Sequence, residues 1–220
     1  MIFSKKMREK VFCIGLGKTG TTSVKQAFND LGYKVGDQGA AELLIQEYGK
    51  RNFKEIIKYC GSAEAFQDAP FCFKYTYVAL DQAFPKAKFI LTLRNSPEHW
   101  YQSLINFHSQ IHSPTGQIPT ESDLKNSTYR YRGFAWDVRQ IVYGVNEGED
   151  PYNKQLLISY YNDHNNAVMD YFRFKSNLLI INLSDKSSYG KMCSFLNKAP
   201  VYAEFPWENK SKLVNEKSSL

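Results

Sequence analysis

The sequence predicts an α/β fold with a mostly parallel sheet that is covered by helices on both faces. Three short apolar runs, at residues 10–16, 88–93 and 177–183, are typical of buried parallel strands. Segments with a helical spacing of apolar residues separate these runs, and such alternation indicates crossover connections in a parallel sheet. Ligands of such sheets bind beyond the carboxyl ends of the strands. The residues that follow each run are therefore the first candidates for function.

The bulk composition is that of one ordinary globular domain. The chain has 220 residues, 43% of them hydrophobic and 23% charged, which suits a single domain over residues 1–220 with a sizeable core. The formal net charge of +6 is a mild positive excess that favours an anionic ligand. The basic residues are dispersed, however, so the charge pattern does not indicate binding to nucleic acid.

Targeting and redox signals favour the cytoplasm. The apolar run at residues 11–16 is too short for the core of a signal peptide, and no stretch approaches the ~20 apolar residues of a membrane span. The four cysteines show neither metal-ligand nor Cys-x-x-Cys spacing. We therefore expect a cytoplasmic protein without a membrane span and without a metal site.

The first part of the chain is predicted to form a strand, a loop and a helix, followed by shorter elements. After the strand at 10–16 comes a Gly-rich loop at 17–21 and a helix at 22–31, which ends at Gly32 because glycine is favoured just after helices. The pattern then predicts short helices at 40–48 and 53–59, a short strand at 63–67, and a helix at 71–84 that opens at Pro70.

The rest of the chain alternates strand and helix around one irregular segment. Pro97 is expected to open a helix that runs to about residue 110, directly after the strand at 88–93. Residues 113–130 are rich in Pro, Gly, Ser, Thr and Asn and predict an irregular loop, a kind of segment that often serves as a functional lid. The remaining predictions are helices at roughly 133–144 and 152–173, a strand at 177–183, a helix at 189–196 and a solvated tail at about 205–220.

The loop after the first strand has the composition of an anion site. Residues 15–23 read Gly-Leu-Gly-Lys-Thr-Gly-Thr-Thr-Ser. Backbone N–H groups at a helix N-terminus favour negative charge, Lys18 adds a full positive charge, and the Thr and Ser residues add hydroxyl donors. Such polar density favours a phosphate-binding loop over an ordinary turn with a helix cap. The residues expected to contact the anion are Gly17, Lys18, Thr19, Gly20, Thr21, Thr22 and Ser23.

Two other phosphate motifs fit this loop poorly. Residues 15–20 match the glycine spacing of the dinucleotide fingerprint, and Asp37 lies near its acidic position, but residues 33–35 are a poor second strand. The Walker A motif requires Lys where Thr21 stands, and no apolar strand ends in the Asp that would hold Mg²⁺. A P-loop kinase and an NAD(P)-dependent oxidoreductase are therefore the weaker enzyme alternatives.

A second candidate anion site follows the strand at residues 88–93. Arg94 stands at the carboxyl end of that strand, and Ser103 lies nine residues later, about two turns into the next helix. An Arg can bind a phosphate through two parallel hydrogen bonds, and a Ser hydroxyl adds a donor. The competing interpretation is a surface Arg94 paired with Glu98.

Together the two motifs resemble those of sulfotransferases that use 3′-phosphoadenosine 5′-phosphosulfate (PAPS). Residues 18–23, Lys-Thr-Gly-Thr-Thr-Ser, resemble the family's 5′-phosphosulfate loop, and Leu-Thr-Leu-Arg at 91–94 with Trp100, Tyr101 and Ser103 resembles its 3′-phosphate site. Softer similarity extends through residues 164–165, 178–181, 193–196 and 205–209. The resemblance implies a three-layer fold like that of P-loop NTPases, without ATPase chemistry.

The resemblance also implies roles for individual residues. Lys18 and residues 19–23 would bind the 5′-phosphosulfate, and Arg94 and Ser103 would bind the 3′-phosphate. Many family members place the Ser eight residues after the Arg, and the offset of nine here rotates Ser103 by about 100° on a helix, unless residues 95–97 absorb the difference. The implied reaction moves the sulfuryl group in line to a hydroxyl or amine, with Lys18 stabilising the leaving phosphate oxygen, and requires no metal.

The general base is the least determined part of the site. Members of the family that this sequence resembles use a Glu or a His as the base. The position of the Glu corresponds to Gln26, which cannot accept a proton, and the position of the His lies near Asp68. Asp68 is therefore the first candidate for the catalytic base, although it also suits the N-cap of a helix that opens at Pro70. His108 and His112 are alternatives. Their spacing of four residues could suit a metal, but no third ligand is evident, so a solvated helix face is the favoured interpretation.

The acceptor and the oligomeric state are left open by the sequence. Residues 113–130 and four aromatic side chains either shape an acceptor pocket or belong to the core: Tyr129, Tyr131, Phe134 and Trp136. A small molecule such as a phenol, a glycan, a lipid headgroup and a peptide tyrosine all fit, and His164 is expected to be structural. A non-catalytic nucleotide-binding protein is the alternative from another class, and it predicts binding of 3′-phosphoadenosine 5′-phosphate without turnover.

Overall fold

A parallel sheet of four strands organises the computed structural model, which describes residues 9–206. The strand order is β2-β1-β3-β4, and every neighbouring pair is parallel. The strands are β1 (Val11–Cys13), β2 (Ala65–Gln67), β3 (Lys88–Leu93) and β4 (Leu178–Asn182). The apolar runs at 10–16, 88–93 and 177–183 and the short run at 63–67 therefore form strands as predicted. Strand β1, which leads into the Gly-rich loop, lies between β2 and β3.

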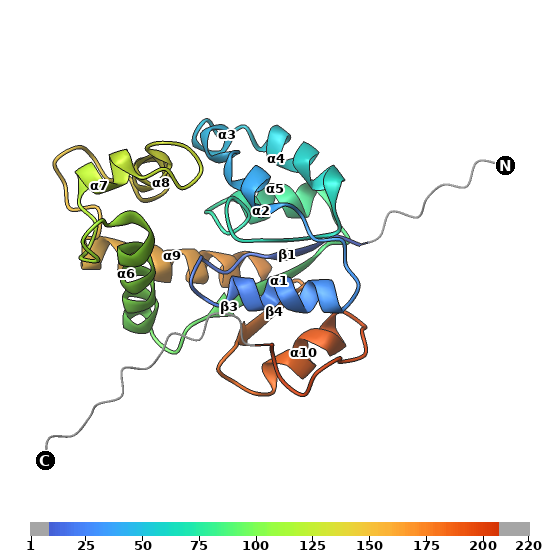
Figure 1. The fold of residues 1–220 in the computed structure, drawn as a ribbon. Helices are drawn as coiled ribbons and strands as arrows, with labels where there is room; N and C mark the ends of the chain where they lie inside the picture. The colour runs from blue at the N-terminus through green and yellow to red at the C-terminus, as the bar shows by residue number, and fades with distance from the viewer. Residues whose placement is uncertain (1–8, 207–220) are drawn as a thin grey trace, which may run out of the picture.

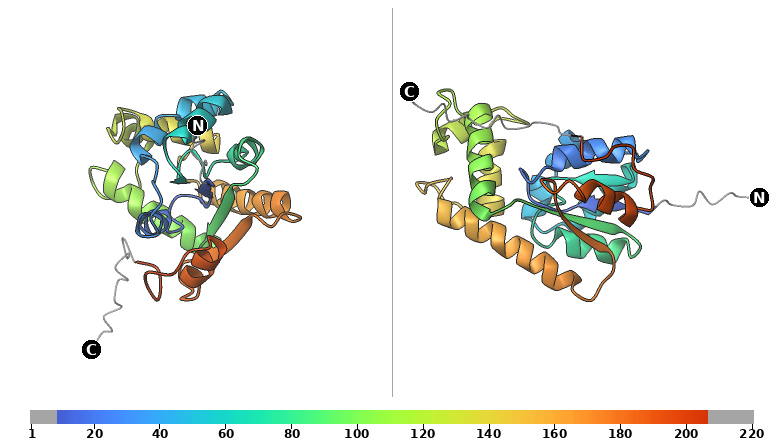
Figure 2. Two further views of the ribbon diagram at one scale, coloured as in Figure 1. Left: turned by 90° about the vertical axis from the view of Figure 1, so that its right-hand side faces the viewer. Right: turned by 90° about the horizontal axis from the view of Figure 1, so that it is seen from below.

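The two faces of the sheet build two hydrophobic layers, because successive side chains of a strand point to opposite sides. On one face Phe12 packs against Phe66 and Phe89, with ring centroids 5.4 and 5.5 Å apart. On the other face Cys13 and Ile90 contribute to the second core. The first face is covered by α4 (Phe53–Tyr59), α5 (Thr76–Ala83) and α9 (Lys154–Phe172), and the second by α1 (Thr21–Asp30) and α10 (Ser188–Phe195). Figures 1 and 2 show the sheet between these two sets of helices, which confirms the three-layer architecture.

A group of helices stands beyond the carboxyl ends of the strands (Figures 1 and 2). It contains α6 (Pro97–His112), α7 (Glu121–Asn126) and α8 (Phe134–Tyr143). Helix α6 packs against α9, and α8 packs against α9 and α3 (Ile45–Gly49). The remaining short elements are α2 (Gln38–Glu42) and a 3₁₀ turn at Cys60–Ser62. This arrangement places a wall of helical side chains opposite the loops that follow β1, β2 and β3.

Two predicted helices have different bounds in the structure. The helix predicted for 71–84 begins only at Thr76, since residues 70–75 form turns and Tyr75 has a left-handed φ of 68°. The helix predicted for 40–48 is two short helices, α2 and α3. The other predicted helices agree to within a few residues, and Gly32 follows α1 with a φ of 79°, as its predicted role requires.

The segment 113–130 is not irregular throughout, which corrects the prediction. It contains α7, whose N-terminus has a complete capping box. The Thr120 hydroxyl accepts a hydrogen bond from the Asp123 N–H at 3.2 Å, and the Asp123 carboxylate accepts one from the Thr120 N–H at 2.8 Å. The sequence carried this signal, because Thr-x-x-Asp is a variant of the known N-terminal pattern.

Further expectations concern the ends of the chain and its cysteines. Phe205 packs in the second core at 3% exposure, whereas residues 207–220 of the predicted tail lie outside the described residues, and Asn209 with them. Cys13, Cys60, Cys72 and Cys193 are buried and free. No helix within residues 9–206 is long and apolar enough to cross a membrane.

Candidate active site

The loop after β1 depends on glycine at two points. A Cβ on Gly15 would lie 2.0 Å from the Thr92 hydroxyl oxygen and 2.6 Å from the Thr92 carbonyl oxygen, so β3 packs directly against the loop backbone. Gly20 has a φ of 101°, and a Cβ there would lie 2.4 Å from Leu183. Only glycine combines this close approach with a left-handed backbone. The two glycines therefore let the loop pass close to β3 and turn into α1, which begins at Thr21.

Side chains from other elements hold the carbonyl groups of this loop. The Trp100 indole N–H donates to the Gly17 carbonyl at 2.9 Å, and Arg94 Nε donates to the Lys18 carbonyl at 2.6 Å. The Tyr161 hydroxyl accepts from the Arg94 N–H at 3.0 Å, and the Tyr161 ring stacks on Trp100 with centroids 4.8 Å apart. Because these carbonyls are occupied by protein donors, the loop can present N–H groups of the α1 N-terminus to an anion.

His164 supports the same loop from below and is structural, as predicted. Its side chain is fully buried, and Nε2 donates to the Ile14 carbonyl at 2.9 Å. Burial lowers its pKa to about 4, because the charged imidazolium would be desolvated. The neutral ring therefore fixes the point at which β1 enters the loop.

Lys18 is the cation of the loop and is partly desolvated. Its Nζ lies 3.5 Å from the centroid of the Phe107 ring, a cation–π contact. Burial lowers its pKa to about 8, against the opposing effect of the Asp68 carboxylate and with a further lowering by Arg94. An arriving phosphosulfate would favour the charged form, so this lysine is suited to an anionic ligand.

The predicted hydroxyl donors of the loop are used in different ways. The Thr19 hydroxyl donates to the Leu16 carbonyl at 2.6 Å and lies 2.5 Å from the Thr92 hydroxyl, so it faces into the fold. Ser23 is also buried, at 2% exposure. Thr22 is exposed and, with Gly17, Lys18, Gly20 and Thr21, lines a cavity. The geometry therefore favours these five residues over Thr19 and Ser23 as direct contacts of a ligand.

The two polar residues of the second motif lie close together, despite the longer spacing between them. Arg94 Nη2 lies 3.4 Å from the Ser103 hydroxyl oxygen. Helix α6 is the next element after β3, and Ser96 caps it by accepting from the His99 N–H at 3.1 Å. Within the described residues no ion pair joins Arg94 to Glu98. Arg94 and Ser103 are thus neighbours, at the edge where the Gly-rich loop also lies.

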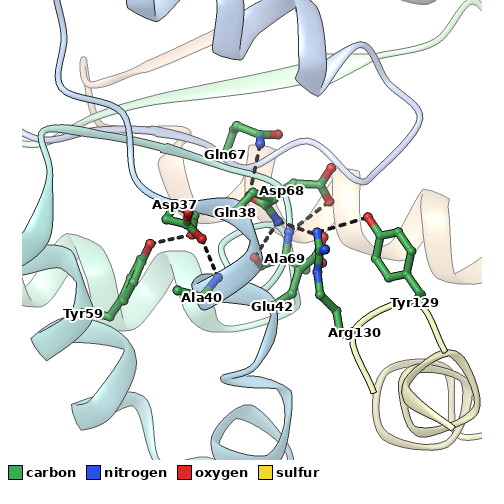
Figure 3. Close-up of polar contacts among 10 residues, drawn as sticks. All are labelled: Asp37, Gln38, Ala40, Glu42, Tyr59, Gln67, Asp68, Ala69, Tyr129 and Arg130. Carbon is green, nitrogen blue, oxygen red and sulfur yellow. Dashed lines mark hydrogen bonds and ion pairs between the residues drawn. The ribbon is translucent and has the colours of Figure 1, made fainter. Parts of the chain in front are cut away.

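Asp68 follows β2 and points at the start of α1 (Figure 3). One carboxylate oxygen accepts from the Thr21 hydroxyl and the other from the Ala69 N–H, each at 2.9 Å. The prediction that Asp68 caps a helix at Pro70 is wrong, because residues 70–75 are turns and α5 begins later. The carboxylate is instead fixed against the anion loop.

A cavity of about 410 Å³ joins these parts at the carboxyl edge of the sheet. Lys18, Arg94 and Asp68 all line it. An apolar wall of the cavity is formed by Leu104, Phe107 and Ile111 of α6 and by Phe134, Ala135 and Val138 of α8. Of the four aromatic residues proposed for a pocket, Tyr129 and Phe134 line the cavity, whereas Tyr131 and Trp136 pack with the core.

A polar cluster at the cavity was not predicted (Figure 3). Glu42 of α2 is 9% exposed and pairs with Arg130, and it accepts from Gln38 at 3.2 Å. Arg130 also donates to the Tyr129 hydroxyl at 3.3 Å. Burial raises the pKa of Glu42, and its hydrogen bond with Arg130 opposes that shift. The pair joins residues 88 apart in sequence, so no local pattern could have indicated it.

His108 and His112 do not form a solvated helix face, which corrects the prediction. Both line the cavity. His108 Nδ1 lies 2.8 Å from Arg139 Nη2 and 2.9 Å from the Tyr152 hydroxyl, and His112 Nδ1 lies 2.7 Å from the Ser127 hydroxyl. Burial, with a contribution from Arg139, lowers the pKa of His108 well below 6.5 and that of His112 to about 4. No group of three metal-binding side chains occurs within residues 9–206.

Comparison with known proteins agrees with this geometry. The family model described as a sulfotransferase domain matches residues 10–214, and the chain belongs to that family, whose reaction is the transfer of a sulfuryl group. Among solved structures, a sulfotransferase from Alicyclobacillus acidocaldarius is similar, with a TM-score of 0.54, 14% identity, and coverage of 93% of this chain and 87% of that chain. This likeness concerns the fold. No curated protein matches the sequence.

Proposed function

We propose that the protein transfers the sulfuryl group of PAPS to the hydroxyl group of a small-molecule acceptor. The single observation that carries the proposal is that Lys18, Arg94 and Asp68 line one cavity. Two cations at the ends of adjacent parallel strands suit a ligand with two separated anionic groups. A carboxylate in the same cavity suits the acceptance of a proton from an alcohol or a phenol.

The donor occupies the loop side of the cavity. Its 5′-phosphosulfate lies against the N–H groups at the start of α1 and against Lys18, where the helix dipole and the ammonium group both favour negative charge. Its 3′-phosphate is bound by Arg94 and Ser103. Two observations support this placement: the loop carbonyls are held by Trp100 and Arg94, and Arg94 lies 3.4 Å from Ser103.

The reaction is an in-line displacement at sulfur. The acceptor oxygen forms a bond to sulfur as the bond between sulfur and the 5′-phosphate oxygen breaks, and the hydroxyl proton moves to Asp68. The products are a sulfate ester and 3′-phosphoadenosine 5′-phosphate. Lys18 stabilises the charge that develops on the leaving phosphate oxygen. Asp68 is oriented for its role by Thr21 and by the Ala69 N–H.

The proposal is tested by calorimetric titration with 3′-phosphoadenosine 5′-phosphate in the absence of magnesium. We expect affinity in the micromolar range, and a loss of at least about tenfold in Lys18→Ala and in Arg94→Ala, since each removes a charged contact. Lys54→Ala and Arg173→Ala are matched controls, because both side chains are exposed and lie outside the cavity lining. Binding of NAD, or of ATP with magnesium, in place of this nucleotide would contradict the proposal.

A further inference from the structure

We propose that His108 is a neutral hydrogen-bond donor to the transferring sulfuryl group, with Arg139 as the positioning residue that fixes its tautomer. The inference rests on the proposed function, because that function places the phosphosulfate in the cavity. Its own evidence is the set of contacts around His108, which come from the loop after β1, from α6, from α8 and from the segment before α9.

The contact with Arg139 determines where the imidazole proton lies. Arg139 belongs to α8, is 1% exposed, and places Nη2 2.8 Å from His108 Nδ1. A guanidinium group has only donors, so Nδ1 must carry the lone pair. The Tyr152 hydroxyl lies 2.9 Å from the same nitrogen and must also donate to it. A neutral His108 therefore carries its proton on Nε2.

The charges around His108 keep the ring neutral. Burial is the main cause of its lowered pKa, and Arg139, His112 and Lys18 each lower it further. The Tyr152 phenol stays protonated, because burial raises its pKa. The only lone pair of the ring faces a guanidinium group. His108 is consequently unsuited to act as the general base, and the donor on Nε2 is present at every physiological pH.

The free edge of the ring belongs to the cavity. Arg139 and Tyr152, which hold the Nδ1 edge, are not among the residues that line the cavity, whereas His108 is. Nε2 has no hydrogen-bond partner in the described part of the chain, and it is not enclosed as a buried unpaired atom. The Lys18 ammonium group makes a cation–π contact with the ring of the neighbouring Phe107. The Nδ1 edge is occupied by residues outside the cavity lining, which leaves Nε2–H as the hydrogen-bonding group that His108 offers to the cavity.

A donor at this place suits the sulfuryl oxygens. They carry negative charge throughout an in-line transfer, and a fixed neutral donor in a partly desolvated cavity stabilises that charge without a titration of its own. The product 3′-phosphoadenosine 5′-phosphate has no sulfuryl group. The affinity for this product should therefore not depend on His108, whereas the affinity for PAPS should.

The tautomer is tested without any ligand, by long-range ¹H–¹⁵N NMR of the whole protein. We expect the proton of His108 on Nε2 and no titration between pH 5.5 and 8. In Arg139→Met, which removes the charged donor to Nδ1, the single Nε2–H form of His108 should give way to a mixture of the two tautomers. A proton on Nδ1, or a titration of the wild-type residue near pH 6.5, would overturn the inference even if the Arg139 variant failed to fold.

Whether His108 Nε2–H donates to the sulfuryl group is tested by calorimetric titration with PAPS and with 3′-phosphoadenosine 5′-phosphate. We expect His108→Phe to bind PAPS about tenfold more weakly and the product within about twofold of wild type. His108→Gln should restore PAPS affinity, because its amide N–H reaches a position close to Nε2. Equal effects on the two nucleotides, or no effect on PAPS, would overturn the inference alone. Failure of the wild-type protein to bind either nucleotide would instead remove the proposed function beneath it.

Discussion

The two ends of the cavity are built in different ways. The donor end, which we propose binds PAPS, consists of residues 14–23, which form one continuous backbone loop, with Arg94 and Ser103 beside it. The acceptor end, which we propose binds the acceptor, consists of Asp68, the Glu42–Arg130 pair and the wall of α6 and α8, and it is built from side chains that meet only after folding. A site formed by one continuous loop can be predicted from neighbouring residues in the sequence, whereas a site formed by side chains from distant segments cannot.

The two ends also differ in how they are held in place. The donor end is fixed by hydrogen bonds from Trp100, Arg94 and His164 to loop carbonyls, so its geometry is set before any ligand arrives. The acceptor end is fixed by the Glu42–Arg130 ion pair and by hydrogen bonds to Glu42 and Asp68. A side-chain change within the acceptor end should therefore alter that end chemically and leave the donor end intact.

The largest expected effect is that of Asp68→Asn on turnover. The amide keeps the shape of the carboxylate but cannot accept a proton, so sulfuryl transfer should fall by about 10²- to 10⁴-fold. Affinity for 3′-phosphoadenosine 5′-phosphate should stay within about twofold of wild type. The rate is measured as formation of this nucleotide from PAPS, with an acceptor found by screening alcohols and phenols. The exposed Asp170→Asn serves as the control, and an undiminished rate in Asp68→Asn would show that the base is elsewhere.

The backbone basis of the donor end is tested by Gly15→Ala. The added Cβ would lie 2.0 Å from the Thr92 hydroxyl oxygen and 2.6 Å from a backbone oxygen, so we expect a loss of about 3 kcal/mol or more in the free energy of unfolding. Gly190→Ala in α10 is the matched control, since its Cβ meets no atom within 4 Å, and it should gain about 0.5–1 kcal/mol. Urea denaturation measures both. Equal stability of Gly15→Ala and wild type would refute the close packing of the loop on β3.

Because His164 holds the Ile14 carbonyl at the start of the donor-end loop, we expect the free energy of unfolding to depend on pH. Its folded pKa of about 4 lies below the ordinary value of 6.5, so the stability contributed by the neutral ring is complete above pH 6.5 and is lost as the pH falls toward 4. The loss at pH 4 is on the order of 3 kcal/mol. His164→Gln keeps a donor for the Ile14 carbonyl but does not titrate. Its urea midpoint should fall less than that of wild type between pH 7 and 4.5, and parallel curves would exclude this role.

The smallest expected effect concerns the charge of Lys18. Its pKa is lowered to about 8 by burial, so the free protein loses this positive charge as the pH rises through 8. Affinity for 3′-phosphoadenosine 5′-phosphate should then fall by up to about tenfold per pH unit above 8. Lys18→Arg does not titrate in this range and should show a flat profile, whatever its absolute affinity. Calorimetry at pH 7, 8 and 9 compares the slopes, and the same slope in both proteins would assign the titration to another group.

The parts of the fold that sequence could predict are those with a local cause. Apolar runs of six or seven residues specified three of the strands, and the polar loop between β1 and α1 is the basis of the proposed anion site. Arg94 lies at the carboxyl edge of the sheet, as expected, because it directly follows β3. Helix α7 was not predicted, although the capping pair of Thr120 and Asp123 indicates where it begins.

The parts that sequence could not predict have distant causes. Nothing near Tyr75 in the sequence predicts its left-handed backbone, which delays the start of α5. The inward orientation of His108 depends on Arg139, which belongs to another helix. Glu42 and Arg130 were not singled out, because their pairing arises from tertiary packing alone. Spacing on α6 identified which histidines share a face and could not tell that the face is buried.

The most direct test of the central claim is a crystal structure with 3′-phosphoadenosine 5′-phosphate bound. We predict that the 5′-phosphate contacts Lys18 and the N–H groups at the start of α1, and that the 3′-phosphate contacts Arg94 and Ser103. The vacant side of the 5′-phosphate should face Asp68 and the apolar wall of α6 and α8. A nucleotide bound with its phosphates in the opposite order, or away from Lys18 and Arg94, would contradict the assignment of the donor end.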